Sequence, residues 1–90
     1  MSQRSSRAEV RNPILMLPGV GRLLSLPLPV RQALAALLDE IAADARERAN
    51  KCWFKHKAPM AAYWKAVAVY ARHIARAVRK DRATDLLRAA

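Results

Sequence analysis

The longest uninterrupted amphipathic segment of the chain, Ala58 to Lys80, constrains the fold more than any other stretch. With a helical rotation of about 100° per residue, its main apolar side chains gather in a sector of about 120°. These side chains are Met60, Tyr63, Trp64, Val67, Ala71, Ile74, Ala75 and Val78. Most of the cations fall on the opposite side, and Pro59 suits a first helical turn. The pattern predicts a helix over residues 59–80 whose apolar stripe packs against another helix.

A second helical pattern precedes this segment and begins at Pro29. Its apolar residues recur every three or four positions, with Leu37 alongside. They are Val30, Leu34, Leu38, Ile41, Ala45, Ala49 and Cys52. We expect a helix over about residues 29–55, joined to the next by the short connection Lys55–Ala58. Because short connections join antiparallel neighbours, the predicted fold class is all-α with an antiparallel helical hairpin at its centre.

The hairpin and the segments that flank it are expected to form a single small domain over residues 12–90. Residues 1–11 are polar and charged and are predicted to form a disordered basic arm. The arginines and serines of this arm also suit a transit peptide, which stays an alternative. Residues 81–90 contain Leu86-Leu87 and are predicted to form a short C-terminal helix.

An apolar segment rich in proline and glycine lies between the arm and the hairpin. Asn12 followed by Pro13 is a plausible helix start, because Asn caps and Pro occupies the first position. Pro18-Gly19 then predicts a turn. We expect this segment to cover apolar surface that a bare helix pair would expose.

The composition indicates an acidic partner. The 90 residues carry 17 Lys and Arg against 7 Asp and Glu, a formal charge of +10. Nucleic acid, an anionic membrane face or an acidic protein surface would each attract such a chain. The single cysteine excludes an internal disulfide, so we expect a cytoplasmic protein. Prolines and glycines interrupt the apolar run Ile14–Val30, and no membrane-spanning helix is expected.

Catalysis and metal binding find little support. Cys52 and His56 are four residues apart and could share a helix face, but a catalytic site also needs an orienting group. No CxxC or HExxH spacing is present, and one Cys with two His supplies at most three ligands. We therefore expect no enzymatic activity, no cofactor and no metal, with Cys52 as a small buried hydrophobe.

The basic residues of the second half are the strongest functional signal. The candidate partner-binding residues are Lys57, Lys65, Arg72, Arg76, Arg79 and Trp53. Trp53 and Phe54 fall off the apolar stripe of their own helix. An aromatic side chain among cations could stack on a base or anchor a protein interface. Alternatively, the N-terminal segment covers Trp53 and Phe54 and makes them core. The sequence leaves both open.

Acidic residues line one side of the first long helix, at Glu40, Asp44 and Glu47. Lys51 follows Glu47 at i+4, which is typical of ion pairs on a solvated helix face. The alternative is that this acidic side docks on the Arg72, Arg76 and Arg79 face of a second copy, giving a two-fold dimer.

Leu17-Pro18-Gly19-Val20-Gly21 resembles the loop of the helix-hairpin-helix DNA-binding family, which has the form hydrophobic-Pro-Gly-hydrophobic-Gly. The resemblance implies that backbone N–H groups bind a phosphate there. It covers five residues, and Pro13 and Pro27 shorten both flanking helices. A Pro-Gly turn within the apolar segment is the alternative.

The run APMAAYWKAVAVYARHIARA, from Ala58 to Ala77, is similar to small helical proteins of phages and mobile elements in Gram-negative bacteria. Some proteins of that size and setting are anti-CRISPR inhibitors. The resemblance implies an accessory protein that acts on a nucleic-acid machine and assigns no site residues. The alternative function is direct, sequence-tolerant binding of DNA or RNA. A membrane-surface module is a third hypothesis.

Overall fold

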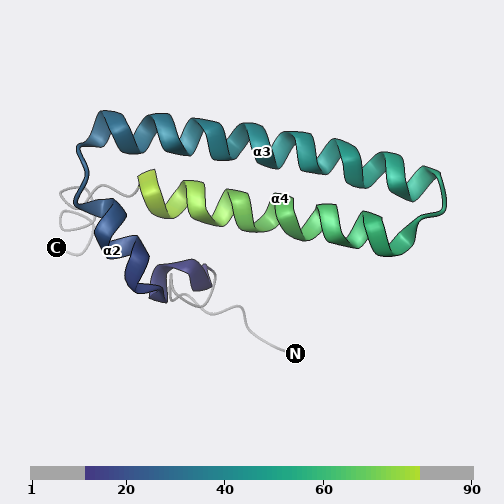
Figure 1. Ribbon diagram of the computed structural model, residues 1–90, viewed down its shortest axis with the longest axis horizontal. Coiled ribbons are helices and arrows are strands. Elements are labelled where there is room, and N and C mark those ends of the chain that lie inside the picture. The colour runs from purple at the N-terminus through teal and green to yellow at the C-terminus, as the bar shows by residue number, and fades with distance from the viewer. Residues whose placement is uncertain (1–11, 80–90) are drawn as a thin grey trace, which may run out of the picture.

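The computed structural model describes residues 12–79. Helix α3 spans Leu28–Phe54 and helix α4 spans Ala58–Arg79, and the two lie side by side and antiparallel (Figure 1). Both begin with a proline in the first turn, Pro29 and Pro59, where the missing N–H costs no hydrogen bond. The all-α hairpin predicted over residues 29–55 and 59–80 is confirmed.

The turn between the two long helices has a defined geometry. The N–H of Lys57 donates to the carbonyl of Cys52 (2.8 Å), and the N–H of His56 donates to that of Trp53 (3.0 Å). These two bonds form the Schellman motif, which satisfies the last carbonyls of a helix. His56 occupies the left-handed position of this motif with φ of 60°. Glycine is the usual residue there, because a Cβ is strained at positive φ.

The contact between α3 and α4 is made by small side chains. Alanines recur every seven residues along both helices and are almost fully buried. They are Ala35, Ala42 and Ala49 on α3, and Ala61, Ala68 and Ala75 on α4. A seven-residue repeat is the spacing of a coiled coil, and small residues on it let two backbones approach closely. We call these six residues the alanine seam; Ala45, Ala71 and Val78 are buried beside it.

The alanine seam corrects the predicted packing. Met60 and Tyr63 were expected to hold the hairpin together, but they are 48% and 56% exposed. On α3, Val30, Leu37 and Ile41 are likewise exposed. The reason is steric: the helices approach most closely where the side chains are smallest. Ile41 and Tyr63 are therefore left together on one flank of the contact.

The N-terminal segment forms two short helical elements. The 3₁₀ turn η1 spans Pro13–Met16 and helix α2 spans Pro18–Leu24. Asn12 starts η1 as predicted, because its side-chain oxygen accepts from the N–H of Ile14 (3.2 Å). The predicted turn at Pro18-Gly19 is wrong, since Pro18 begins α2 instead.

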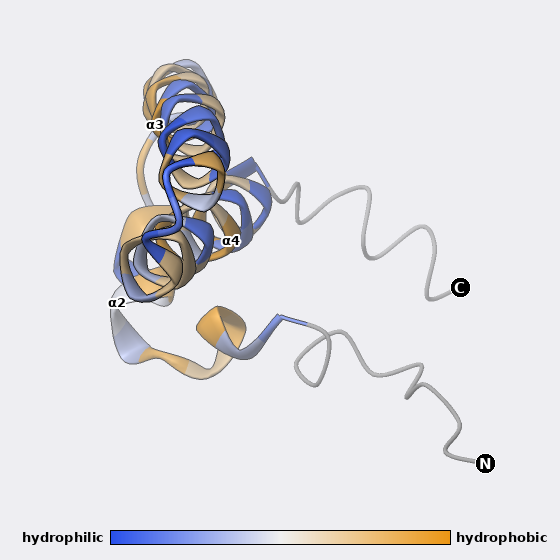
Figure 2. Cartoon of the chain, turned by 90° about the vertical axis from the view of Figure 1, so that its right-hand side faces the viewer, coloured by the Kyte–Doolittle hydropathy of each residue, from blue (hydrophilic) through white to orange (hydrophobic). Residues whose placement is uncertain are grey.

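This segment packs against α4 near its C-terminal end, at the left of Figure 1. Buried Asn12 donates from Nδ2 to the carbonyl of His73 (2.9 Å), and Val20 of α2 is also buried. The two elements therefore cover part of one helix as expected. They leave Trp53 and Phe54, at the far end of the hairpin, uncovered. Figure 2 shows the two short elements beneath the hairpin and the mixture of hydropathy along its outer surfaces.

The predicted arm over residues 1–11 and the predicted short helix over residues 81–90 lie outside the described residues.

A candidate polyanion-binding face

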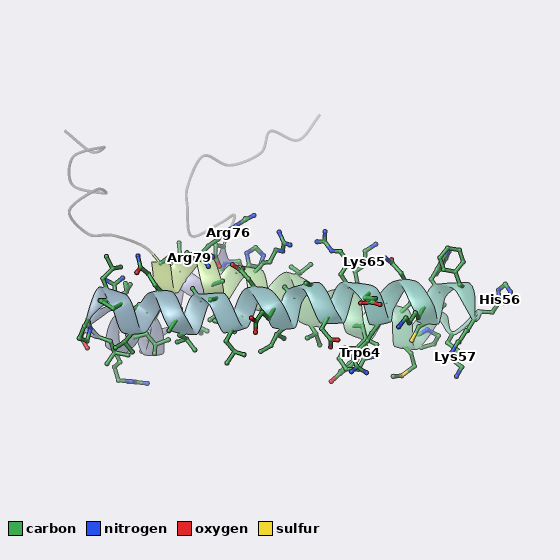
Figure 3. The ribbon with its side chains drawn as sticks, turned by 90° about the horizontal axis from the view of Figure 1, so that it is seen from above. His56, Lys57, Trp64, Lys65, Arg76 and Arg79 are labelled. Atoms are coloured by element: carbon green, nitrogen blue, oxygen red, sulfur yellow. The ribbon has the colours of Figure 1, made fainter. Side chains whose placement is uncertain are left out.

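The two long helices form a layer with two flat faces, one on each flank of the alanine seam. Figure 3 views this layer edge-on and draws Lys65, Arg76 and Arg79 along one edge, with Trp64 on the opposite edge. Arg72 lies seven residues from both Lys65 and Arg79, so the helical repeat places it on the same side. On α3, Arg46 and Trp53 line one hollow together with Lys65. We call the side of these six residues the basic face.

Arg79 has an intramolecular partner on the basic face. Its Nη1 lies 2.7 Å from Oδ2 of Asp39, so the ion pair joins α4 to α3. Both side chains are nearly half exposed, and such a pair contributes about 0–1 kcal/mol to stability. Asp39 thereby neutralises one of the predicted partner-binding cations. Sequence periodicity could not detect this pair, because it depends on how the two helices are aligned.

The other cations of the basic face are exposed. Within residues 12–79, no carboxylate forms an ion pair with Arg46, Lys65, Arg72 or Arg76. Three of these four come from α4, which explains why the stretch Ala58–Lys80 carries the strongest basic signal. Their charges point to solvent and can meet an external anion without first breaking an internal ion pair.

Trp53 is 66% exposed and Phe54 is 81% exposed. The core alternative for these two side chains is therefore wrong, and the exposed alternative holds. Trp53 lines its hollow with Arg46, Asn50 and Lys65, beside the alanines of the second helix. An exposed indole among cations can stack on a base or enter a protein pocket.

Lys57 lies outside the basic face. It lies in the loop at the end of the hairpin, beside His56 (Figure 3). The structure thus brings five of the six predicted partner-binding residues to one face. It adds Arg46, whose place beside Trp53 follows from the seven-residue spacing of the two.

Two other acidic residues of α3, Asp44 and Glu47, pair along their own helix at the i+4 spacing. Arg48 Nε lies 2.7 Å from Oδ2 of Asp44, and Lys51 Nζ lies 3.3 Å from Oε1 of Glu47. The hydrogen bond to Asp44 and the charge of that carboxylate raise the pKa of Arg48 above its usual value. The same guanidinium lies over the Trp64 ring, 5.1 Å from its centroid, and joins the two helices by a cation–π contact.

Cys52 and His56 do not form a common site. Cys52 is half-buried in the last turns of α3, whereas His56 lies beyond the end of that helix with left-handed backbone. In the part of the chain that the structure describes, no group of three His, Cys, Asp or Glu side chains could hold a metal ion. The same residues include no helix long and apolar enough to cross a bilayer.

Of the five residues that resemble a helix-hairpin-helix loop, Leu17 precedes α2 and the other four form its first turn. Gly19 and Gly21 are both inside this helix, and neither has positive φ. The element before them is a 3₁₀ turn of 4 residues. The segment therefore lacks a hairpin loop between two full helices.

Comparison of the chain with models of protein families, with curated protein sequences and with solved structures gave no match. The fold class is that of an all-α antiparallel hairpin with an N-terminal cover.

Proposed function

We propose that the chain is a non-enzymatic interaction protein that binds a polyanionic surface through its basic face. Its partner is an acidic protein surface of a nucleic-acid machine, and its setting is that of a phage or mobile-element accessory protein of the anti-CRISPR type. One observation carries the proposal: Arg46, Lys65, Arg72 and Arg76 share one flat face and have no ion-pair partner among residues 12–79.

Most cations of the basic face form a row along α4, and the length of this row favours a polyanion over a single small anion as the ligand. Lys65 and Arg76 are 11 residues apart on one helix, or about 16 Å at 1.5 Å per residue. A small anion contacts only one or two of these cations at a time. A surface with repeated negative charges engages all of them, and it gains from each contact because arginine binds carboxylates and phosphates in bidentate geometry.

The exposed Trp53 favours a second candidate function, direct binding of single-stranded or double-stranded nucleic acid. Its indole lies at the end of the row that is nearest to the loop, where a base could stack while the cations contact phosphates. Stacking of this kind is sequence-tolerant, because every base has a π-face. This function uses the same face and is separated from the first by experiment.

The proposal is tested by capture on the immobilised full chain, from a lysate of bacteria that carry a CRISPR system, with and without nuclease treatment. We expect retained proteins that survive the nuclease. The charge-reversal variant Arg72→Glu/Arg76→Glu should lose them. The matched control Lys51→Glu/Lys55→Glu makes the same charge change at the end of α3, away from the basic face, and should keep them. Equal loss of the retained proteins in both variants would mean that net charge, rather than the basic face, determines capture.

A salt series with a short DNA duplex and a single strand decides between the two functions. Direct binding predicts that the logarithm of the affinity falls linearly with the logarithm of salt concentration. The captured protein partner should instead bind in the absence of any nucleic acid. If neither a protein nor DNA is retained through Arg72 and Arg76, both functions are excluded.

A further inference from the structure

The flat face opposite the basic face is apolar. Most of its side chains line one shallow groove between α3 and α4, and none of the groove residues is charged. Leu37, one helical turn before Ile41, extends the groove and is also exposed. We define the apolar face by Leu37, Leu38, Ile41, Tyr63, Val67, Tyr70 and Ile74.

The 3₁₀ turn η1 packs beside this face rather than over its centre. Pro13 of η1 lines a different hollow, together with Val69 and His73 on the outer side of α4. Ala66 and Tyr70 border both hollows. Within residues 12–79, Leu37, Tyr63 and Tyr70 of the apolar face stay more than half exposed to solvent.

The area of the face approaches that of a subunit interface. An aromatic side chain buries about 150–250 Å² when it is enclosed, so half-exposed Tyr63 and Tyr70 together offer about 200 Å². With the aliphatic residues, the face offers on the order of 500 Å², near the upper end of apolar patches on monomers. A stable dimer buries about 800 Å² on each partner, which this face and its polar rim can provide.

The charge distribution selects a second copy as the occupant. The face is neutral in a chain of formal charge +10. The first charged residues beyond Ile41 on this side of α3 are Asp44 and Arg48, and they pair with each other. An acidic partner would gain no charge contact here, whereas a second copy brings an equally neutral, apolar face.

Stacking two copies through this face also keeps their cations apart. Each helical layer is about 10 Å thick, so the two basic faces lie on the outer surfaces about 20 Å apart. This distance exceeds the Debye length of about 8 Å at physiological ionic strength, so repulsion between the two rows is screened. A dimer through the basic faces would place the cations in contact.

We propose that a second copy of the chain covers the apolar face and forms a two-fold dimer whose four long helices make a bundle. This dimer differs from the one suggested by the acidic residues of α3, because Arg72, Arg76 and Arg79 stay outside the interface. It also presents two basic faces, so that one dimer can engage a repeated polyanion at two points. The inference is independent of the proposed function.

The composition of the core gives a reason for association. Between Asn12 and Arg79, alanines dominate the core, and Val78 is the largest fully buried side chain. Alanine contributes little apolar area, so the hairpin leaves most of its large apolar side chains unburied. Dimerisation encloses those of the apolar face and stabilises the fold, and folding then depends on protein concentration.

The test is the molar mass of the full chain, measured by light scattering and sedimentation over a wide range of protein concentration. We expect the mass of two chains. Ile41→Glu places a charge in the apolar face of each copy and should raise the dissociation constant of the dimer roughly 100-fold or more. The control Ala33→Glu adds the same charge at an exposed position seven residues before Glu40, on the back of α3, and should remain dimeric.

A second measurement serves if Ile41→Glu fails to fold. In a Cys52→Ala background, Val67→Cys near the centre of the face should be joined to its copy by a short bifunctional maleimide. Ala33→Cys should not be joined. A monomeric wild-type chain at every concentration would overturn the proposal, as would dissociation of Ala33→Glu or equal cross-linking at both cysteines. None of these results bears on polyanion binding, which is measured separately.

Discussion

Arg31 at the start of α3 donates a hydrogen bond of 3.1 Å from Nη1 to the carbonyl oxygen of Val78 at the end of α4. Its Nε donates to the carbonyl of Leu26 in the connection before α3 (3.0 Å). Arg31 is 9% exposed. One cation thus satisfies a carbonyl of α4 and one of the connection before α3, and it complements the negative end of the α4 dipole. The open end of the hairpin is held by this residue, as the loop holds the other end.

Arg31→Met should therefore destabilise the fold. Hydrogen bonds from a charged donor contribute about 1.5–3 kcal/mol each, and the substitution leaves two carbonyls to find water. We expect a loss of about 2–3 kcal/mol in the free energy of unfolding, measured by urea denaturation at a fixed protein concentration. Arg31→Lys should be intermediate, because one ammonium group reaches both carbonyls poorly.

The neighbouring substitution Gln32→Met is the control, since Gln32 is exposed. It should change stability by less than about 0.5 kcal/mol. Equal effects at the two positions would mean that Arg31 contributes by its place in the helix rather than by its hydrogen bonds.

The left-handed backbone of His56 predicts a stabilising substitution. His56→Gly removes the Cβ that is strained at φ of 60°. We expect a gain of about 0.5–1 kcal/mol, reduced in part by the greater freedom of glycine in the unfolded chain. Lys55→Gly, one residue earlier and with φ of −88°, should instead lower stability. Thermal unfolding of the two variants measures the difference, and a loss of stability at both positions would contradict the Schellman geometry.

The alanine seam predicts that a larger side chain is harmful at one position and harmless at the next. Ala42 is 1% exposed and faces α4, whereas Ala43 is exposed. Ala42→Leu forces the helices apart and should cost about 1–3 kcal/mol. Ala43→Leu should stay within about 0.5 kcal/mol of the wild type. Alanine and leucine are both good helix formers, so helix propensity changes little in either variant. Similar stabilities for the two variants would therefore show that the alanine seam is not closely packed.

Particular residues show which features of the fold the sequence predicts. The 3.6-residue periodicity and the prolines at positions 29 and 59 predict both long helices, because these signals are local. The sequence predicts less well which side of each long helix faces the other long helix. Hydropathy assigns Met60 and Tyr63 to the contact, while the seven-residue recurrence of Ala61, Ala68 and Ala75 carries it. Hydropathy gives alanine little weight, although its small size decides how closely two helices pack.

The candidate site likewise has a part that the sequence predicts and a part that it does not. The cations of α4 lie on one helix, so their common side is visible in the sequence. The pairing of Arg79 with Asp39 and the exposure of Trp53 depend on how α3 and α4 align and on where the N-terminal segment packs. These are long-range relationships, and no spacing rule along the chain contains them.

Trp53→Ala separates stability from binding. Because Trp53 is 66% exposed, its truncation should change the free energy of unfolding by less than about 0.5 kcal/mol. If the indole anchors a partner, binding should weaken by roughly 2 kcal/mol or more. Binding carried by cations alone should barely change. Circular dichroism on heating and a titration with the captured partner or a DNA strand provide the two readouts, with Phe54→Ala as the exposed aromatic control.

Removing the negative charge of Asp39 should strengthen polyanion binding. Asp39→Asn releases Arg79 from its 2.7 Å ion pair and raises the net charge of the basic face by one. If the partner is nucleic acid, we expect higher affinity and a salt dependence that is steeper by about one phosphate contact. Stability should fall by no more than about 1 kcal/mol, because the pair is nearly half exposed.

Asp44→Asn is the matched control for this substitution, because it makes the same change in charge. Asp44 pairs with Arg48 on the other side of α3, so the basic face is unaltered. Its affinity for the polyanion should stay near that of the wild type at physiological salt, where charges beyond about 8 Å are screened. Equal strengthening in both variants would mean that net charge, rather than the arrangement of the cations on one face, determines binding.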